Sequence, residues 1–303
     1  MLSISEVSMR SIPPKVILVA TDFSRTAGEA LRYASAIAER NGARLVVIYA
    51  DQFIPPLDEV SMTQAQATIE QLLAAAQEKL TAQVKSRVST FVPFEARVIL
   101  DGAVPAIVRL AKESEADLLV MGTHGRTGFR RLVVGSVCES VLKTVDVPVL
   151  AVSDAAARNS TTEIHKIVCG VDYSLECAEA LRLAAAIAPE ARLILIRADD
   201  GESPTRTSDD LRRLGRWLPS ELIDRCELKV IGASAAEDLA SFAAMAGADL
   251  IAAGAPQKHA LGDFLRGTAT DRIVQHSECP VLMVNANAAR REMAAVAERA
   301  CAV

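Results

Sequence analysis

The sequence predicts an α/β fold with two similar doubly wound domains, each built on a five-stranded, parallel, Rossmann-like sheet. Two observations support this prediction. Short apolar runs that are typical of buried strands alternate with amphipathic helical segments. The same pattern then recurs later in the chain, with matched residues at constant spacing. The length of 303 residues suits two such units.

The first copy alternates regularly from residue 16 to residue 152. Its expected strands are 16–20, 44–50, 94–100, 117–121 and 148–152, and its expected helices are 26–40, 64–88, 103–114 and 136–145. This alternation implies parallel strands joined by right-handed crossovers. The binding crevice of such a sheet lies where the strand order reverses, here between the first and fourth strands.

The second copy can be matched to the first residue by residue. The tetrapeptide Glu29-Ala30-Leu31-Arg32 recurs as Glu179-Ala180-Leu181-Arg182, at the same offset of 150 that separates Asp22 from Asp172. Later matches, such as Gly122 with Gly254, are offset by 132. Constant offsets indicate a duplicated domain. The smaller offset places a deletion inside the second copy, where only a shorter helix is expected, around 209–218.

These matches define the expected domain boundaries. We expect a first domain over residues 1–152, a polar and alanine-rich linker over 153–164, and a second domain over 165–285. The remaining residues, 286–303, are expected to form a short helical tail. It could pack on a partner copy, but fraying at the terminus is the favoured interpretation.

Composition argues against several classes of protein. The net charge of −5 gives no electrostatic support for nucleic-acid binding. No apolar run approaches the roughly 18 residues that span a membrane, and residues 1–14 lack the hydrophobic core of a signal peptide. The six cysteines show no paired spacing, and Cys138 and Cys169 fall at positions expected to be buried. A cytoplasmic protein with reduced cysteines is expected, with a redox-sensing cysteine as a minor alternative.

The most informative segment is 121–136, which lies between an expected strand and an expected helix. It holds Gly122, Gly125, Gly135 and Ser136 in the spacing Gly-x2-Gly-x9-Gly-Ser. Backbone N–H groups at the start of a helix lack partners, and the helix dipole favours an anion there. Glycines allow the backbone to approach an oxyanion, and Ser136 adds a hydroxyl donor. The segment therefore predicts a phosphate-binding site.

Three motifs together resemble the universal stress proteins, in the branch of that family that binds ATP. They are the glycine motif, Thr21-Asp22-Phe23-Ser24 after the first strand, and the closing strand 148–152. The resemblance implies a stress-response regulator or nucleotide sensor that binds ATP, with or without Mg²⁺, rather than an efficient enzyme. The residues implied to contact the nucleotide are Asp22, Ala50, Gly102, Gly122, Gly125, Gly135, Ser136 and Val137.

The resemblance also implies how the two copies meet. Members of the family commonly pair through their fifth strands, and an exposed edge strand needs covering. Residues 148–152 are therefore expected to lie antiparallel to 280–284, which would join the copies as a pseudo-dimer. Further association of two chains into a homodimer remains open.

Some of these residues also have simpler structural interpretations. Asp22 could cap the following helix, but Ser24 can do so instead, which favours a ligand role for Asp22. Gly102 could equally belong to an ordinary turn. The remaining glycines could form a turn and a capped helix, although their combined spacing favours phosphate.

The second copy departs from the motif. It keeps Asp172, Gly254, Gly267 and Thr268, but Gln257 stands where the first copy has Gly125, and Pro256 removes a backbone N–H. Arg197 replaces Tyr49 at the end of the second strand. A degenerate site is therefore expected, and ATP should prefer the first copy.

A slow ATPase on the same scaffold is the main alternative function. The chain has no Gly-x4-Gly-Lys-Ser/Thr loop, and no second carboxylate pairs with Asp22 to hold a metal or activate water. A flavoprotein is disfavoured because aromatic residues that could stack on a flavin make up only 4% of the chain.

Overall fold

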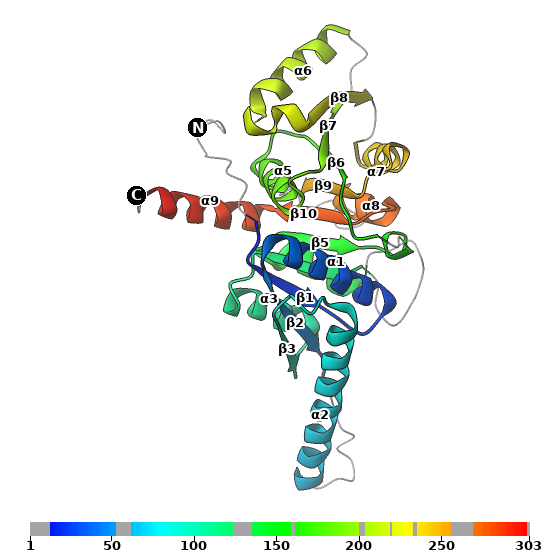
Figure 1. The fold of residues 1–303 in the computed structure, drawn as a ribbon, viewed down its shortest axis with the longest axis vertical. Coiled ribbons are helices and arrows are strands. Elements are labelled where there is room, and N and C mark those ends of the chain that lie inside the picture. Colours follow the sequence, from blue (N-terminus) through cyan, green and yellow to red (C-terminus); the bar gives the residue numbers. More distant parts are fainter. Residues whose placement is uncertain are drawn as a thin grey trace, which may run out of the picture.

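The computed structural model describes residues 13–52, 62–123, 135–158, 161–199, 204–218, 220–232, 235–255 and 269–301. The strands in these residues form one ten-stranded sheet of order β3-β2-β1-β4-β5-β10-β9-β6-β7-β8 (Figure 1). The first half contributes β1 (Val16–Ala20), β2 (Arg44–Ala50), β3 (Phe94–Ile99), β4 (Leu118–Gly122) and β5 (Val149–Val152). The second contributes β6 (Lys166–Gly170), β7 (Arg192–Asp199), β8 (Cys226–Gly232), β9 (Leu250–Ala255) and β10 (Val281–Asn285).

Each half is a parallel, doubly wound unit, as the sequence predicted. In the first half β1 pairs with both β2 and β4, so the strand order reverses between β1 and β4. In the second half β6 pairs with both β7 and β9 in the same way.

The halves meet through their fifth strands. β5 and β10 pair antiparallel, with Val281 opposite Ala151, Leu282 opposite Leu150 and Met283 opposite Val149. The predicted pairing of 148–152 with 280–284 is therefore confirmed, and the two sheets become one.

Helices cover both faces of this sheet. The first half has α1 (Arg25–Asn41), α2 (Met62–Arg87), α3 (Ala103–Glu113) and α4 (Ser136–Thr144). The second has α5 (Leu175–Ile187), α6 (Pro204–Trp217), α7 (Ala235–Ala246), α8 (Ala269–His276) and α9 (Ala286–Cys301), with short 3-10 segments η2 (Ala156–Arg158) and η3 (Ser220–Arg225). One core lies under α1, α2, α5, α6 and α9, and the other under α3, α4, α7 and α8. Both cores contain residues of both halves, so the layers are continuous across the junction.

The second crossover, from the second strand to the third, differs between the halves, as the offsets implied. α2 has 26 residues, and its first half extends beyond the body of the molecule (Figure 1), whereas Leu80 and Val84 near its end are buried. α6 has only 14 residues. It begins at Pro204 rather than near 209, which is consistent with the tolerance of proline in the first turn of a helix.

The tail and the linker are more ordered than the sequence suggested. The preference for a fraying tail is wrong for the start of α9, where Ala286, Ala288 and Ala289 are buried. The linker is likewise anchored, with Ala156 and Ile164 buried in the same core. Small alanine side chains allow both segments to pack closely, so their alanine content marks contact surfaces rather than loose chain.

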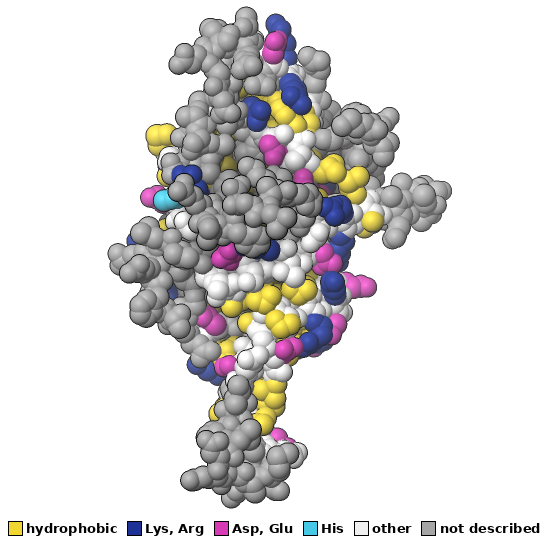
Figure 2. Space-filling view, turned by 180° about the vertical axis from the view of Figure 1, so that it is seen from behind, with side chains coloured by type: hydrophobic (Ala, Val, Ile, Leu, Met, Phe, Trp, Pro, Cys, Tyr) yellow, Lys and Arg dark blue, Asp and Glu magenta, His cyan; other side chains and the backbone are white. Residues whose placement is uncertain are grey.

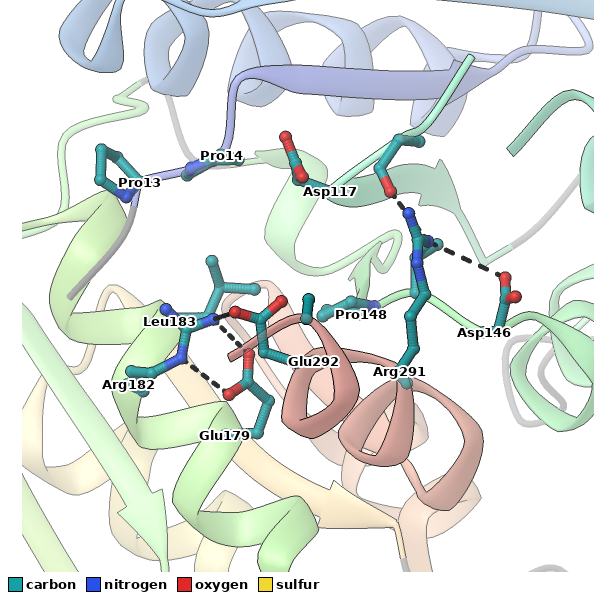
Figure 3. Close-up of a pocket in the computed structure, with 14 residues that line it drawn as sticks. Pro13, Pro14, Asp117, Asp146, Pro148, Glu179, Arg182, Leu183, Arg291 and Glu292 are labelled. Carbon is teal, nitrogen blue, oxygen red and sulfur yellow. Dashed lines mark hydrogen bonds and ion pairs between the residues drawn. The ribbon is translucent and has the colours of Figure 1, made fainter. Parts of the chain in front are cut away.

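A cavity of about 140 Å³ lies beside α9, between the two halves (Figure 3). Asp117, Asp146, Arg182, Arg291 and Glu292 are among the residues that line it, and ion pairs join several of them. Pro148 also lines it, and this residue immediately precedes β5. The cavity therefore lies at the amino ends of the first half's strands, opposite to the edge where the predicted site of that half lies.

Within the described ranges, no helix is long and apolar enough to cross a membrane, and no three His, Cys, Asp or Glu side chains are grouped to hold a metal ion. On the face shown in Figure 2, the described Lys and Arg side chains lie interspersed with Asp and Glu. This mixed distribution agrees with the modest net charge of −5.

Candidate functional site

The predicted site residues that the structure describes in the first half come from the carboxyl ends of neighbouring strands or from helix starts nearby. Ala20, which ends β1, is level with Ile48 of β2 and with Met121 of β4. The next residues, among them Asp22, Ala50 and Gly122, therefore emerge together at one edge of the sheet. This is the edge at which parallel α/β sheets bind ligands.

Asp22 lies in a tight turn that ends before α1. Its Oδ1 accepts a hydrogen bond from the Ser24 N–H at 2.9 Å, and Phe23 between them has a left-handed backbone with φ of 67°. Ser24 is the helix cap, since its side chain accepts from the Ala27 N–H at 3.2 Å. The capping role considered for Asp22 thus belongs to Ser24, and Asp22 orders the turn.

The second copy repeats this turn. Tyr173 has φ of 64°, Asp172 Oδ1 accepts from the Ser174 N–H at 2.9 Å, and Ser174 caps α5. A left-handed backbone is unfavourable for an aromatic residue. The turn is therefore common to both copies, although Gln257 replaces Gly125 in the second.

Two other helices begin near this edge with glycine caps. Gly102 precedes α3 and Gly135 precedes α4, and neither helix start has a side-chain capping hydrogen bond. Ser136 and Val137, the first residues of α4, are exposed. The first N–H groups of a helix have no partner within the helix. These two helix starts therefore differ from that of α1, which Ser24 caps, and suit an anion.

The turn before α3 is ordered by Asp101. Its carboxylate accepts from the Gly102 N–H and from Arg109 Nη1, both at 2.7 Å. The Arg109 hydrogen bond and the Gly102 N–H together hold the pKa of Asp101 below its usual value. Asp101 therefore stays ionised and fixes the start of α3.

Gly122 has a packing role that its sequence motif does not reveal. A Cβ at this position would lie 2.8 Å from Thr26 Oγ1 and 2.9 Å from the Ala27 backbone nitrogen. Gly254 in the second copy shows the same restriction, with a Cβ 2.6 Å from the Cys177 nitrogen. The first motif glycine therefore allows α1 or α5 to approach the strand, whether or not a ligand is bound. This packing role explains why a glycine is retained at the matching position of the second copy.

Replacing Gly122 by alanine should lower the free energy of unfolding by about 1–3 kcal/mol, because the new methyl group overlaps backbone atoms that cannot move independently. Urea unfolding followed by circular dichroism measures this change. Gly215→Ala is the matched control, since nothing lies within 4 Å of a Cβ inside α6 at that position. That substitution should be neutral or stabilising. Equal effects of the two substitutions would contradict the packing role.

Three predicted site residues, Gly125, Gly267 and Thr268, lie outside the described residues. At the boundary of one such segment the chain is anchored by Thr123. This buried residue donates its N–H to the Val152 carbonyl at 3.0 Å and accepts the Gly135 N–H at 2.7 Å. Thr123 could not be identified from the sequence because these hydrogen bonds are made by its backbone.

An aromatic cluster beside Asp22 was also missed. The rings of Phe23 and Tyr49 lie 4.5 Å apart, and Lys79 Nζ lies 4.2 Å from the centre of the Phe23 ring. In the second half Tyr173 contacts Arg197 and Arg213, with guanidinium carbons 5.6 and 4.0 Å from the ring centre, and the edge-on Trp217 ring lies 6.0 Å away. The replacement of Tyr49 by Arg197 therefore adds a cationic side chain to the wall behind the turn.

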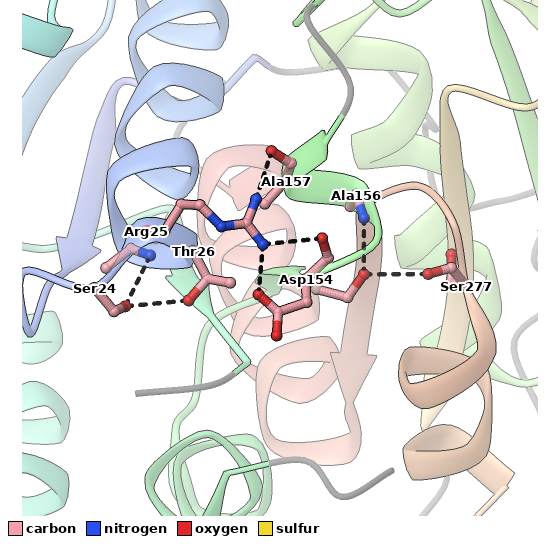
Figure 4. A network of polar contacts seen from close by, with 9 residues as sticks. Ser24, Arg25, Thr26, Asp154, Ala156, Ala157 and Ser277 are labelled. Carbon is pink, nitrogen blue, oxygen red and sulfur yellow. Dashed lines mark hydrogen bonds and ion pairs between the residues drawn. The ribbon is translucent and has the colours of Figure 1, made fainter. Parts of the chain in front are cut away.

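The start of α1 is tied to the linker (Figure 4). Arg25 donates to the Asp154 carboxylate at 2.8 Å and to the Ala157 carbonyl at 3.2 Å. The turn that carries Asp22 is thus connected directly to the segment between the halves.

Comparisons with known proteins agree with this architecture. Residues 14–153 and 163–285 each match the family described as "Universal stress protein family". A universal stress protein of Methanocaldococcus jannaschii is 29% identical over 156 residues, which cover 47% of this chain and 96% of that protein. One from Thermus aquaticus is 35% identical over 139 residues, covering 46% and 98%. The crystal structure of a universal stress protein from Archaeoglobus fulgidus superposes with a TM-score of 0.65 at 15% identity, covering 89% of this chain and 98% of that one.

Proposed function

Because the chain belongs to the universal stress protein family, we propose that its first domain, residues 1–152, binds ATP and that the protein acts in the cytoplasm as a nucleotide-dependent stress regulator. The observation that supports ATP most directly is the pair of helix starts at Gly102 and Gly135. They lack side-chain caps and lie near the edge of the sheet from which Asp22 emerges. The first N–H groups of these helices, together with a nearby carboxylate, suit a ligand with both phosphate and ribose.

Each residue has a defined part in this proposal. The backbone N–H groups of Ser136 and Val137 and the Ser136 hydroxyl bind phosphate oxygens, and any Mg²⁺ enters with the phosphates. Asp22 accepts hydrogen bonds from the ribose, and the main chain at Ala50 contacts the adenine. The fit is supported by the exposure of Ser136 and by the glycine caps of both helices.

We propose that the second domain, residues 165–285, is an altered site. The motif there contains Pro256 and Gln257 where the first copy has His124 and Gly125. A side chain at the second glycine position would crowd phosphates that the backbone should approach. The arginine pair at Tyr173 changes the neighbouring wall as well.

Titration calorimetry with ATP tests the assignment. Wild-type protein should bind one ATP per chain, with clear preference for the site in residues 1–152. Gly125→Gln should weaken binding by about 1–3 kcal/mol, through a lost backbone donor and crowding. Asp22→Ala should also weaken it, whereas the matched control Asp172→Ala in the second copy should not. Equal affinity at two sites, or unchanged binding by Gly125→Gln, would refute the proposed asymmetry.

The alternative of a slow ATPase is tested by turnover. A sensor should retain ATP and hydrolyse it slowly or not at all. Sustained hydrolysis faster than about one per second, lost in Asp22→Ala or Ser136→Ala, would favour an enzyme instead.

A further inference from the structure

The residue that ends β10 connects the second half to the helix that begins at the glycine motif of the first. Asn285 is only 7% exposed. Its Nδ2 donates to the carbonyls of Leu142 and Val145, both at 2.8 Å, and its Oδ1 accepts from the Ala288 N–H at 2.9 Å. The two carbonyls lie at the C-terminal end of α4, and Ala288 lies in the first turn of α9. One buried side chain thus holds both helices.

The equivalent residue of the first half makes the reciprocal contact. Ser153 lies 132 residues before Asn285, at the offset that relates the two motifs. Its Oγ donates to the Ser277 carbonyl at 3.1 Å and accepts from the Ala156 N–H at 3.1 Å (Figure 4). Ser277 immediately follows α8 as Val145 follows α4, and Ala156 begins η2. Each half therefore reaches across the β5–β10 junction to the fourth helix of the other.

We propose that Asn285 is a positioning residue for the ATP site, acting through α4, and that α9 responds to the nucleotide through the same side chain. This inference rests on the proposed function. α4 has only nine residues, about 13 Å at 1.5 Å per residue, and such a short helix moves as a unit. Its C-terminal carbonyls are held by Asn285, and its N-terminal end carries Gly135 and Ser136. Fixing the C-terminal end of α4 therefore orients its N-terminal end.

The two contacts are unequal in a way that matches the two motifs. Asn285 makes two hydrogen bonds to the end of α4, in the half with the complete motif, whereas Ser153 makes one to the end of α8. The helix that is proposed to bind phosphates is therefore the more firmly held. An alanine substitution at Asn285 would leave two carbonyls without this donor and release the cap of α9.

The coupling must act in both directions. If the contacts of Asn285 with α4 and α9 increase the affinity for ATP, then bound ATP must stabilise those contacts by the same factor. Arg291 adds a second contact between α9 and the first half, since its Nη1 donates to the Ala116 carbonyl at 3.1 Å. The start of α9 is consequently the segment in which nucleotide binding should be detected outside the site.

Hydrogen exchange on the full-length protein without nucleotide tests the positioning step. Asn285→Ala should accelerate exchange of the Gly135 and Glu139 amides at the start of α4 about fivefold or more. The matched variant Ser153→Ala should leave these amides unchanged and accelerate those of α8. Unchanged protection of Gly135 and Glu139 in Asn285→Ala would overturn the inference, whether or not the protein binds ATP.

ATP titration then tests the coupling to the site. Asn285→Ala should weaken ATP binding about fivefold, Asn285→Ser should retain part of the affinity, and Ser153→Ala should bind like wild type. In wild type, saturating ATP should slow exchange of the amides at 288–292 by a similar factor. Failure of the wild type to bind ATP would refute the proposed function alone. Tight binding by Asn285→Ala with unaltered α9 exchange would refute the coupling.

Discussion

Leu282→Ala should lower the free energy of unfolding by about 3–5 kcal/mol, as is typical of a leucine truncated in a rigid core. Leu282 is fully buried in β10, directly opposite Leu150 of β5. The cavity created by this substitution would lie at the centre of the ten-stranded sheet, where strands on both sides restrict relaxation. Urea unfolding by circular dichroism measures the loss.

The same experiment tests whether the halves unfold together. Both hydrophobic cores contain residues of both halves, so one cooperative transition is expected, and Leu282→Ala should shift all of it. Leu72→Ala is the control, because Leu72 on the projecting part of α2 is 41% exposed and its loss should change stability by no more than about 0.5 kcal/mol. Two separate transitions, with only one shifted, would show that the halves are independent.

The architecture was predictable because its signals are local. Apolar runs such as 16–20 and 44–50 correspond to strands with the same bounds, since a strand buried on both faces needs continuous apolar sequence. Ser24 was recognisable as a helix start because capping involves residues only three apart. The β5–β10 pairing followed from the family resemblance rather than from these local patterns.

The contacts that connect the halves could not be predicted in this way. Asn285 donates to residues about 140 positions away, and nothing in its local sequence marks it as a cap for α4. Gly122 was interpreted as a ligand or turn residue and not as a packing residue, because the approach of α1 to β4 depends on tertiary packing. The tail was expected to fray for the same reason, because the contacts of its alanines are also tertiary. Residues of the candidate site were proposed from their motif, whereas the residues that support the candidate site could not be.

One repeated tetrapeptide shows how far local sequence can mislead. Glu29-Ala30-Leu31-Arg32 and Glu179-Ala180-Leu181-Arg182 are identical, and each forms an ion pair between its first and last residues. The side chain of Arg32 is 33% exposed, and its partner Glu29 also pairs with Arg87 at 2.9 Å. The side chain of Arg182 is only 9% exposed, because α9 covers it and contributes Glu292 at 3.4 Å (Figure 3). The same four residues therefore have different energetic importance.

Arg182→Ala should consequently lower the free energy of unfolding by about 3–5 kcal/mol, the range for removing one member of a buried ion pair. Arg182 donates to Glu179 at 2.7 and 2.5 Å. Burial lowers the pKa of its guanidinium, but the hydrogen bonds to Glu179 and the charges of Glu179, Glu292 and Asp117 together outweigh this effect and leave the pKa above its usual value. The guanidinium therefore stays charged, and its removal leaves two partly buried carboxylates facing each other where α9 meets α5.

The control for Arg182→Ala is Arg32→Ala, which should lower stability by no more than about 1 kcal/mol because the pair is partly exposed and Glu29 keeps Arg87. Arg182→Met separates charge from volume: it retains much of the side-chain bulk, so a loss as large as that of Arg182→Ala would assign the effect to the missing charge. Hydrogen exchange should show α9 loosened in both Arg182 variants, since the repulsion between Glu179 and Glu292 acts across its contact with α5. A loss below about 1 kcal/mol for Arg182→Ala, with α9 still protected, would mean that alanine packing alone holds the tail. In that case the identical tetrapeptides would be equivalent in energy despite their different burial.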